Sequence, residues 1–396
     1  MVFAPLSWLA RLARSQPSLI QSTHRSPSFR DEEAFPAVGF AGTAREQSQL
    51  LAPGGRDNEP PVRLPAEGAS FSAFFRALIL FGLLLFTLTP ATARAEGLKA
   101  GILKFGTVEW LLDVIKQHKL DAKEGYELST LALASNNALQ VALLGREADV
   151  IVTDWFWVLR QRSAGDDFQF APYSTAVGAV MVPAASQIKS VEDLRGKKIG
   201  VAGGPLDKGW LLLRARGLDT DAGDLSETAR PVYGAPPLLN QQAIYGDVDA
   251  LLTYWHFAAQ LEAGGFRRLT SVTELMKQVG LKADLPLIGF AFSGKLAKAQ
   301  PDVIAGFVRS VRAAQDILLK SDAEWERIRP LMRPASDAEF ATLRDRYREG
   351  ITFAWGPDQQ AEAAKLFGIL AKLGGDDLTG KNVAFDPQIF WQAPSN

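Results

Sequence analysis

The chain has 396 residues, 47% hydrophobic and 22% charged, which is the composition of a globular protein and excludes a disordered, collagenous or polytopic membrane chain. Its 43 Lys and Arg residues nearly balance its 44 Asp and Glu residues, so charge gives no reason to expect a nucleic-acid partner. At about 150 residues per domain, the chain is long enough for two or three compact units.

The first segment, residues 1–75, is rich in Arg, Pro and Ser and has no sustained apolar periodicity. No lysine occurs in the first 95 residues. A segment of this kind cannot bury much apolar surface. We therefore expect residues 1–75 to be a disordered or spurious N-terminal extension, with translation starting later, near Val62.

The next segment, residues 76–95, has the order of parts of a signal peptide. Arg76 precedes a thirteen-residue apolar run, and Ala93-x-Ala95 follows it at the distance of a cleavage site. The run is too short to cross about 30 Å of hydrocarbon as a helix. We expect cleavage before Glu96 and a periplasmic protein; an uncleaved anchor or a buried helix is the alternative. Without cysteine the protein is not a lipoprotein.

From residue 97 on, short apolar runs alternate with amphipathic stretches, which predicts an α/β fold. The first series alternates strand and helix at 98–103, 108–118, 126–131, 137–144, 149–152 and 154–162. After a strand at 177–182, the second series has strands at 199–201, 229–233, 250–252 and 266–269 and helices at 205–216, 236–245 and 255–262. After another apolar strand at 285–292, helices are expected at 301–319, 337–348 and 357–373.

The strands at 177–182 and 285–292 are candidates for two crossings between two lobes. We expect residues 96–180 and 290–396 to form lobe 1 and residues 181–289 to form lobe 2. The C-terminal helices are expected to pack against lobe 1.

Several expected helices begin directly after a strand and a short polar turn, at Thr107, Ser135, Asp154 and Gly204. Helix N-termini carry unpaired N–H groups and a partial positive charge, so converging N-termini form an anion site. Ligands of open α/β sheets also bind at the carboxyl ends of strands. The alternative is that these residues only cap helices, with Asn137 and Gln140 forming a capping box.

Aromatic side chains gather at the same strand ends and could enclose a ligand. They are Phe105, Trp110, Trp155, Trp157, Tyr254 and Trp255. The alternative is that they are core residues. Trp155 and Trp157 cannot share a helical face, so only one of them is expected to face a ligand.

Nothing in the sequence predicts catalysis. The charged or titratable residues near the expected ligand site are Lys104, Asp154, Asp207, Lys208 and His256. They show no spacing of a nucleophile and a base, and no phosphate-binding loop is present. With three histidines and no cysteine, we expect no metal and no cofactor.

The segment Ser190–Val201, which reads SVEDLRGKKIGV, resembles the S-x-x-D-L-x-G-K-K-I-x-V block of the nitrate/sulfonate/taurine group of periplasmic substrate-binding proteins of ABC transporters. Other blocks agree in order and spacing: Gly101–Gly106, Ser135-Asn136 with Ala138-Leu139, Gly145–Ile151 and Tyr245–Ala250. The resemblance covers residues 97 to about 370, and it is specific to the fold rather than to a ligand.

The resemblance implies the type II periplasmic binding fold, with a ligand in the cleft between two lobes, closure about a hinge, and delivery to an ABC permease in the inner membrane. It also implies a monomer as the default. Together with Trp110, which the aromatic pattern adds, the ligand-binding residues are expected to be Lys104, Phe105, Gly106, Thr107, Ser135, Asn136, Asp154, Trp155, Gly204, Pro205, Tyr254 and Trp255.

The expected ligand is a small organic anion such as a sulfonate, nitrate or taurine. The heavy aromatic content also leaves a larger aromatic anion or a pyrimidine-like molecule open. The alternative function is an enzyme on the same fold, like the pyrimidine synthases of thiamine biosynthesis or the dehydratases of menaquinone biosynthesis. The signal peptide and the lack of cysteine oppose this alternative. A lobe that presents its ligand to a membrane receptor is a third possibility.

Overall fold

The computed structural model describes residues 96–104, 106–381 and 383–393. The expected N-terminal extension, residues 1–75, and the expected signal peptide, residues 76–95, lie outside the described residues. No helix within the described ranges is long and apolar enough to cross a membrane.

The first sheet has five strands in the order β2-β1-β3-β10-β4. Strand β1 runs parallel to β2 and β3, whereas β10 runs antiparallel to β3 and β4. The strands are β1 (Glu96–Leu103), β2 (Tyr126–Leu133), β3 (Val150–Asp154), β4 (Phe168–Ser174) and β10 (Ile288–Ser293). The helices between β1 and β4 are α2 (Val108–Gln117), α3 (Leu120–Lys123), α4 (Asn136–Leu144) and α5 (Trp155–Ser163).

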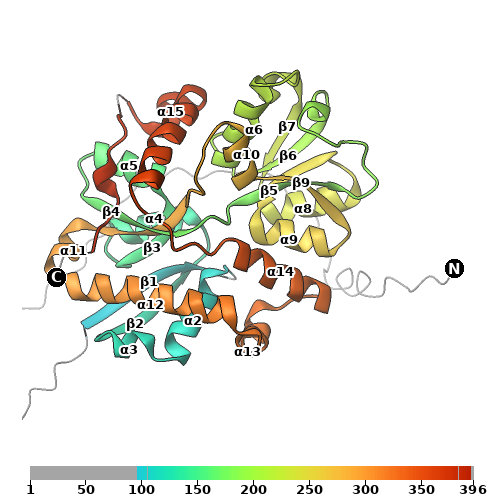
Figure 1. Ribbon diagram of the computed structural model, residues 1–396. Helices are drawn as coiled ribbons and strands as arrows, with labels where there is room; N and C mark the ends of the chain where they lie inside the picture. Colours follow the sequence, from blue (N-terminus) through green and yellow to red (C-terminus); the bar gives the residue numbers. More distant parts are fainter. Residues whose placement is uncertain (1–95, 105, 382, 394–396) are drawn as a thin grey trace, which may run out of the picture. The chain divides into compact units, whose positions relative to one another are not determined.

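The second sheet repeats this plan in the order β7-β6-β8-β5-β9, with β5 as the antiparallel strand beside β8 and β9 (Figure 1). Its strands are β5 (Gly178–Pro183), β6 (Lys198–Ala202), β7 (Arg230–Gly234), β8 (Ala250–Tyr254) and β9 (Phe266–Ser271). Its helices are η1 (Glu192–Leu194), α6 (Lys208–Leu218), α7 (Leu225–Thr228), α8 (Pro236–Tyr245), α9 (Trp255–Ala263) and α10 (Val272–Gln278). The α/β fold class expected from the sequence is confirmed.

The chain passes from one sheet to the other in two short segments. It leaves the first sheet after Ser174 and enters the second at Gly178, and it returns through residues 279–287. Strand β5 therefore belongs wholly to the second sheet, although the sequence boundary at residue 180 divides it. We call each sheet with the helices between its strands the first and the second lobe.

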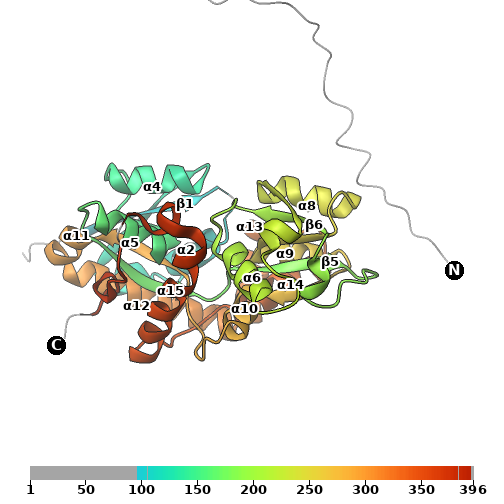
Figure 2. The ribbon, with the colours of Figure 1, turned by 90° about the horizontal axis from the view of Figure 1, so that it is seen from above.

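The last part of the chain is helical, as expected, but it does not belong to the first lobe alone. Its elements are α11 (Gly294–Ala299), α12 (Pro301–Lys320), α13 (Asp322–Met332), α14 (Asp337–Glu349), α15 (Pro357–Thr379) and η2 (Pro387–Ile389). Helix α12 packs on α2 and α3 of the first lobe, whereas α14 packs on α9 of the second lobe. Figures 1 and 2 both show α14 beside α9. The prediction that these helices pack only on lobe 1 is therefore wrong for α14.

The reason is partly electrostatic. Arg346 of α14 forms an ion pair with Glu262 of α9, and Arg268 of β9 reaches Glu349 at 3.3 Å. These pairs follow from tertiary proximity, and no sequence pattern marks them.

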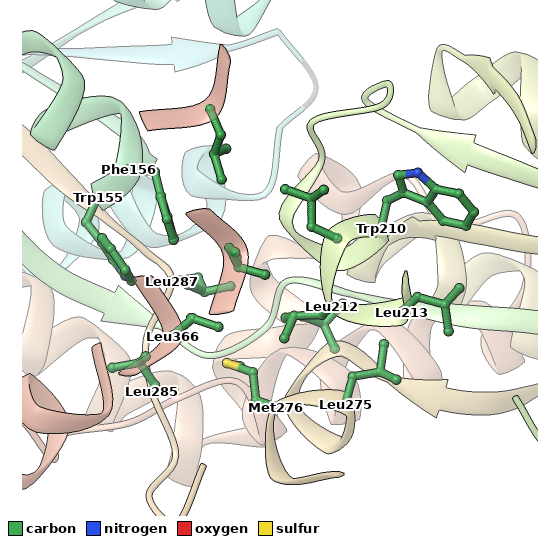
Figure 3. Close-up of a cluster of buried hydrophobic side chains, with 14 of the residues drawn as sticks. Trp155, Phe156, Trp210, Leu212, Leu213, Leu275, Met276, Leu285, Leu287 and Leu366 are labelled. Atoms are coloured by element: carbon green, nitrogen blue, oxygen red, sulfur yellow. The ribbon is translucent and has the colours of Figure 1, made fainter. Parts of the chain in front are cut away.

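Helix α15 also joins the lobes, because it packs on both α5 and α6. The largest hydrophobic cluster is continuous from one lobe to the other. Figure 3 shows part of it, with Trp155 and Leu366 on the first-lobe side and Leu212 and Met276 on the second-lobe side. The apolar core therefore does not stop at the lobe boundary.

The first crossing is held by a glycine carbonyl. Gly350, directly after α14, accepts hydrogen bonds from the Thr175 amide at 3.0 Å and the Ser174 hydroxyl at 3.1 Å. A Cβ built on Gly350 would lie 2.4 Å from the Cβ of Ala176. The crossing strand and the end of α14 thus approach as closely as glycine allows.

We expect Gly350→Ala to lower the free energy of unfolding by about 1 to 3 kcal/mol, because the added methyl group has no room. The matched control is Gly368→Ala in α15, where a Cβ meets nothing within 4 Å and removal of a helical glycine should stabilise the protein by about 0.5 to 1 kcal/mol. Urea unfolding of both variants checks this. Equal effects of the two substitutions would contradict the close approach at Gly350.

Candidate functional site

Three helix N-termini at the strand ends are already capped by side chains. Ser135 accepts a hydrogen bond from the Ala138 amide at 3.2 Å, and Asp154 accepts one from the Trp157 amide at 3.1 Å. In the second lobe, Asp207 accepts one from the Trp210 amide at 3.0 Å. These residues therefore do what helix caps do. Helix α4 begins at Asn136 and is capped by Ser135, so the expected capping box at Asn137 is wrong.

Helix α6 begins at Lys208, three residues later than expected. Gly203 and Gly204 both have positive φ angles, 91° and 101°, which a helix cannot contain. The turn delays the helix and brings Asp207 and Lys208 to its start. As a result, the second lobe presents a carboxylate and an ammonium group at this position.

An ion pair joins the two lobes at these helix starts. The Lys208 ammonium lies 2.7 Å from Oδ2 of Asp154, the residue that ends β3 and caps α5. Each side chain is 24% exposed, so water reaches the pair. The groups come from opposite lobes and from 54 positions apart in the sequence.

Two other helix N-termini have no side-chain cap. Helix α2 begins after Thr107, whose side chain makes no capping hydrogen bond, and α9 begins after Tyr254, which makes none either. One helix lies in each lobe. Because Asp154 and Asp207 fill the N-termini of α5 and α6 with negative charge, α2 and α9 are the better places for an anion.

Asp207 and Tyr254 both lie against the Gly203 turn. A Cβ on Gly203 would lie 2.7 Å from the Tyr254 hydroxyl oxygen and 3.2 Å from Oδ2 of Asp207. Both residues line a cavity of about 10 Å³, large enough for a single water, together with Val177, Gly178, Ala202, Leu252, Thr253 and Val272.

This environment changes the acidity of both groups. Burial raises the pKa of Asp207 to about 6, and the nearby Asp154 carboxylate adds to the effect. Burial, with Asp207 as a second cause, raises the pKa of Tyr254 to about 12. Burial lowers the pKa of His256 to about 4, so this histidine is neutral at pH 7 and adds no charge to the site.

Aromatic side chains of the two lobes meet edge to face. The rings of Trp110 in α2 and Trp255 in α9 are 6.1 Å apart at 88°. Both rings also contact Tyr347 of α14, whose hydroxyl lies 2.6 Å from that of Tyr173. Trp110 is buried in this cluster, whereas Trp255 is partly exposed.

Trp155 lies elsewhere. Its side chain is 0% exposed, stacks on Phe156 at 4.0 Å, and packs against Phe385 and Phe390 near the C-terminus. Trp157 is buried as well, against Phe168. The expectation that one of these two tryptophans faces a ligand is wrong, because core side chains pack against both faces of α5.

The remaining residues expected at the site lie at the surface or partly exposed. Phe105 lies outside the described residues. The described residues of this set lie near the starts of α2, α4 and α6. They are Lys104, Gly106, Ser135, Asn136, Gly204 and Pro205. Among the residues of known position, no group of three or more His, Asp or Glu is arranged to hold a metal ion.

Sequence reasoning missed Tyr347 and Tyr173 entirely. Tyr347 sits in a helix that was expected to pack against lobe 1, and Tyr173 sits in β4, a strand that was not predicted. Asp207 and Lys208 were recognised as charged residues near the site but were not included in it. The Gly203-Gly204 turn was the available signal, since it moves the helix start to Asp207.

We expect Asp207→Asn to stabilise the protein relative to the wild type, and more so as the pH rises from 4 to 7. Below pH 4 the Asp207 carboxyl is protonated in both the folded and the unfolded state, so it costs no stability. Because its folded-state pKa is raised from 3.8 to about 6, the cost of burying the carboxylate grows as the pH rises through this range and is complete above pH 6. The relative gain should reach about 1 to 3 kcal/mol. Urea unfolding at several pH values measures it.

The matched control is Asp224→Asn, because the bidentate hydrogen bonds from Arg214 at 2.8 Å hold the pKa of Asp224 below its ordinary value. The contribution of Asp224 is present at neutral pH and is lost as the pH falls below 4. A pH-independent difference between wild type and Asp207→Asn from pH 4 to 7 would contradict the burial of this carboxyl.

Comparison with solved structures shows the fold. The alkanesulfonate-binding protein SsuA from Xanthomonas axonopodis pv. citri, bound to MOPS, is 19% identical with a TM-score of 0.58, over 76% of this chain and 99% of that one. The periplasmic aliphatic sulphonate binding protein SsuA from Escherichia coli is 20% identical with a TM-score of 0.61, over 76% and 94%. The type II periplasmic binding fold is therefore confirmed.

The same fold also occurs in an enzyme. The desulfurization enzyme DSZB is 14% identical with a TM-score of 0.51, over 74% of this chain and 96% of that one. No curated protein matches the sequence. The family described as NMT1/THI5 like matches residues 122–324, just over half of the chain. Since that match contains every strand of the second sheet and all strands of the first sheet except β1, the chain belongs to the NMT1/THI5-like family.

Proposed function

We propose that this protein is an exported solute-binding protein that captures a small organic anion between its two lobes and delivers it to an ABC permease in the inner membrane. The proposal includes a periplasmic location and a monomeric state. Family membership and the fold shared with two sulfonate-binding proteins support it.

The observation that carries the proposal is the ion pair between Asp154 and Lys208. Charged groups from opposite lobes meet at the carboxyl ends of the strands, where open α/β sheets bind ligands. A ligand anion that replaces Asp154 as the partner of the Lys208 ammonium would contact both lobes at once. Binding would then couple directly to the relative position of the lobes.

The anionic group would lie between the uncapped N-termini of α2 and α9, within reach of Lys208. Trp255, which is partly exposed, would cover the apolar part of the ligand. Trp110 would support Trp255 from behind. The other proposed ligand contacts are Lys104, Gly106, Thr107, Ser135, Asn136, Gly204, Pro205 and Tyr254.

Movement of the lobes would bend the chain at the two crossings. Residues 175–177 form the first and residues 279–287 the second. Closure requires that the ligand bind the closed form more tightly than the open form by a few kcal/mol. The contact of α14 with α9 adds a third connection, which limits the directions of movement.

The alternative is an enzyme on this fold, and two observations favour it. The desulfurization enzyme DSZB shares the fold. Asp207 and Tyr254, whose pKa values are both shifted by burial, lie against the same turn.

A thermal-shift screen of the purified protein against sulfonates, nitrate, aromatic carboxylates and pyrimidines tests the proposal. A ligand that binds only the folded state raises its stability by RT ln(1 + [L]/Kd). Mass spectrometry of the ligand recovered from the complex separates the two functions, because a binding protein returns it unchanged. Turnover of the ligand would establish the enzyme instead, and no shift with any compound would contradict binding of these classes.

We expect Lys208→Gln to weaken binding of the ligand by roughly 1 to 3 kcal/mol, because a charge-assisted hydrogen bond to the anion is lost. The matched control is Lys197→Gln, which removes one exposed charge from the same lobe. Titration calorimetry gives both affinities. Unchanged affinity in Lys208→Gln would leave the cross-lobe ion pair with no part in binding.

A further inference from the structure

A second cavity lies within the first lobe and shares no residue with the candidate site. Its volume is about 450 Å³, within the range of small-molecule sites. Its walls come from β4, β10 and α12, from Pro286 in the second crossing, from the segment after α14 at 352–355, and from the segment after η2 at 391–393. Segments far apart in the sequence thus combine to form it.

The walls are mostly apolar and aromatic. Phe290 of β10 and Val311 of α12 are buried in the lobe core, and Trp391 packs on the same cluster. Trp355 contacts Phe390, with ring centres 4.4 Å apart. Phe353, 47% exposed, stands among the lining residues at the surface. A flat apolar molecule therefore has aromatic surfaces to contact on more than one side.

The polar side chains of the lining are two arginines, two glutamines and Thr352. Arg309 and Arg312 both lie on α12, one turn apart. Glu124 pairs with Arg309 through contacts of 2.7 and 2.8 Å. Arg312 makes no ion pair or hydrogen bond with any residue whose position is described. Because the lining includes no Asp or Glu, the cavity is positively charged.

The side-chain amide of Gln315, another lining residue, donates to the Tyr173 carbonyl at 3.0 Å and is already used. Arg312 is therefore the charged donor of the lining that no described residue pairs with.

We propose that this cavity binds an aromatic organic anion, with a sulfonate or carboxylate on Arg312 and the ring system among Trp355, Trp391 and Phe290. The unpaired guanidinium supplies the charge-assisted hydrogen bonds. The aromatic walls replace the water around the ring system. This site is separate from the cleft, so it does not depend on the solute-binding proposal.

Titration calorimetry with 2-naphthalenesulfonate, on the full protein, tests this site. Arg312→Gln should weaken binding about 10- to 100-fold, and Arg312→Lys, which keeps the charge, should recover part of the loss. Arg312 is exposed, so neither variant should change the thermal unfolding of the ligand-free protein. The matched control is Lys298→Gln, which removes one exposed charge from α11 of the same lobe and should not change the affinity.

Lys208→Gln separates this site from the cleft. If the probe binds only at Arg312, Lys208→Gln leaves its affinity unchanged. If the probe also binds in the cleft, the wild type takes two molecules and each variant loses one, which also supports the proposal. No binding at millimolar probe, unchanged binding in Arg312→Gln, or loss of all binding in Lys208→Gln would overturn it.

Discussion

Each lobe depends on a strand that reaches its sheet only after a crossing. Strand β5 is the antiparallel member of the second sheet and follows directly from the first lobe, and β10 has the same place in the first sheet after the return. The first lobe is therefore discontinuous in sequence, whereas the second lobe, residues 178–278, is a contiguous insertion between β4 and β10. In each sheet the other four strands run in one direction, so the helix starts discussed above lie at strand carboxyl ends.

The crossings do not act alone in joining the lobes. The carbonyl of Gly350 holds the first crossing, α14 is paired with α9 by charged residues, and α15 continues the apolar core from α5 to α6. The edge-to-face contact of Trp110 with Trp255 adds an aromatic connection at the helix starts. The residues that would respond to a ligand are thus in contact with those that connect the lobes.

The charge at the helix starts differs from that of the second cavity. Asp154 and Asp207 cap α5 and α6 and neutralise the positive ends of those helices. The proposed anion there would depend on Lys208 and on the two uncapped helices. In the second cavity, the lining has no carboxylate and Arg312 has no partner among the described residues. Two anion sites with such different surroundings would select ligands of different shape and size.

Much of the fold could be predicted from the sequence, because apolar periodicity and caps are local. The helix Pro236–Tyr245 was predicted with its bounds, and most other predicted elements lie within a few residues of their predicted ends. Strand β4, which contains Pro172, and the short helices were missed because their patterns are short or interrupted. The S-x-x-D-L-x-G-K-K-I-x-V block also indicated the family correctly.

The sequence by itself determined the α/β class, the two series of strands and helices, and the residues at the helix starts. Tertiary structure decided which of those residues are free to meet a ligand. Trp155 and Trp157 became core because C-terminal aromatic residues and β4 cover them, and Asp154 met Lys208 because two separate helix starts converge. Such outcomes depend on contacts between residues distant in the chain, which local patterns do not encode.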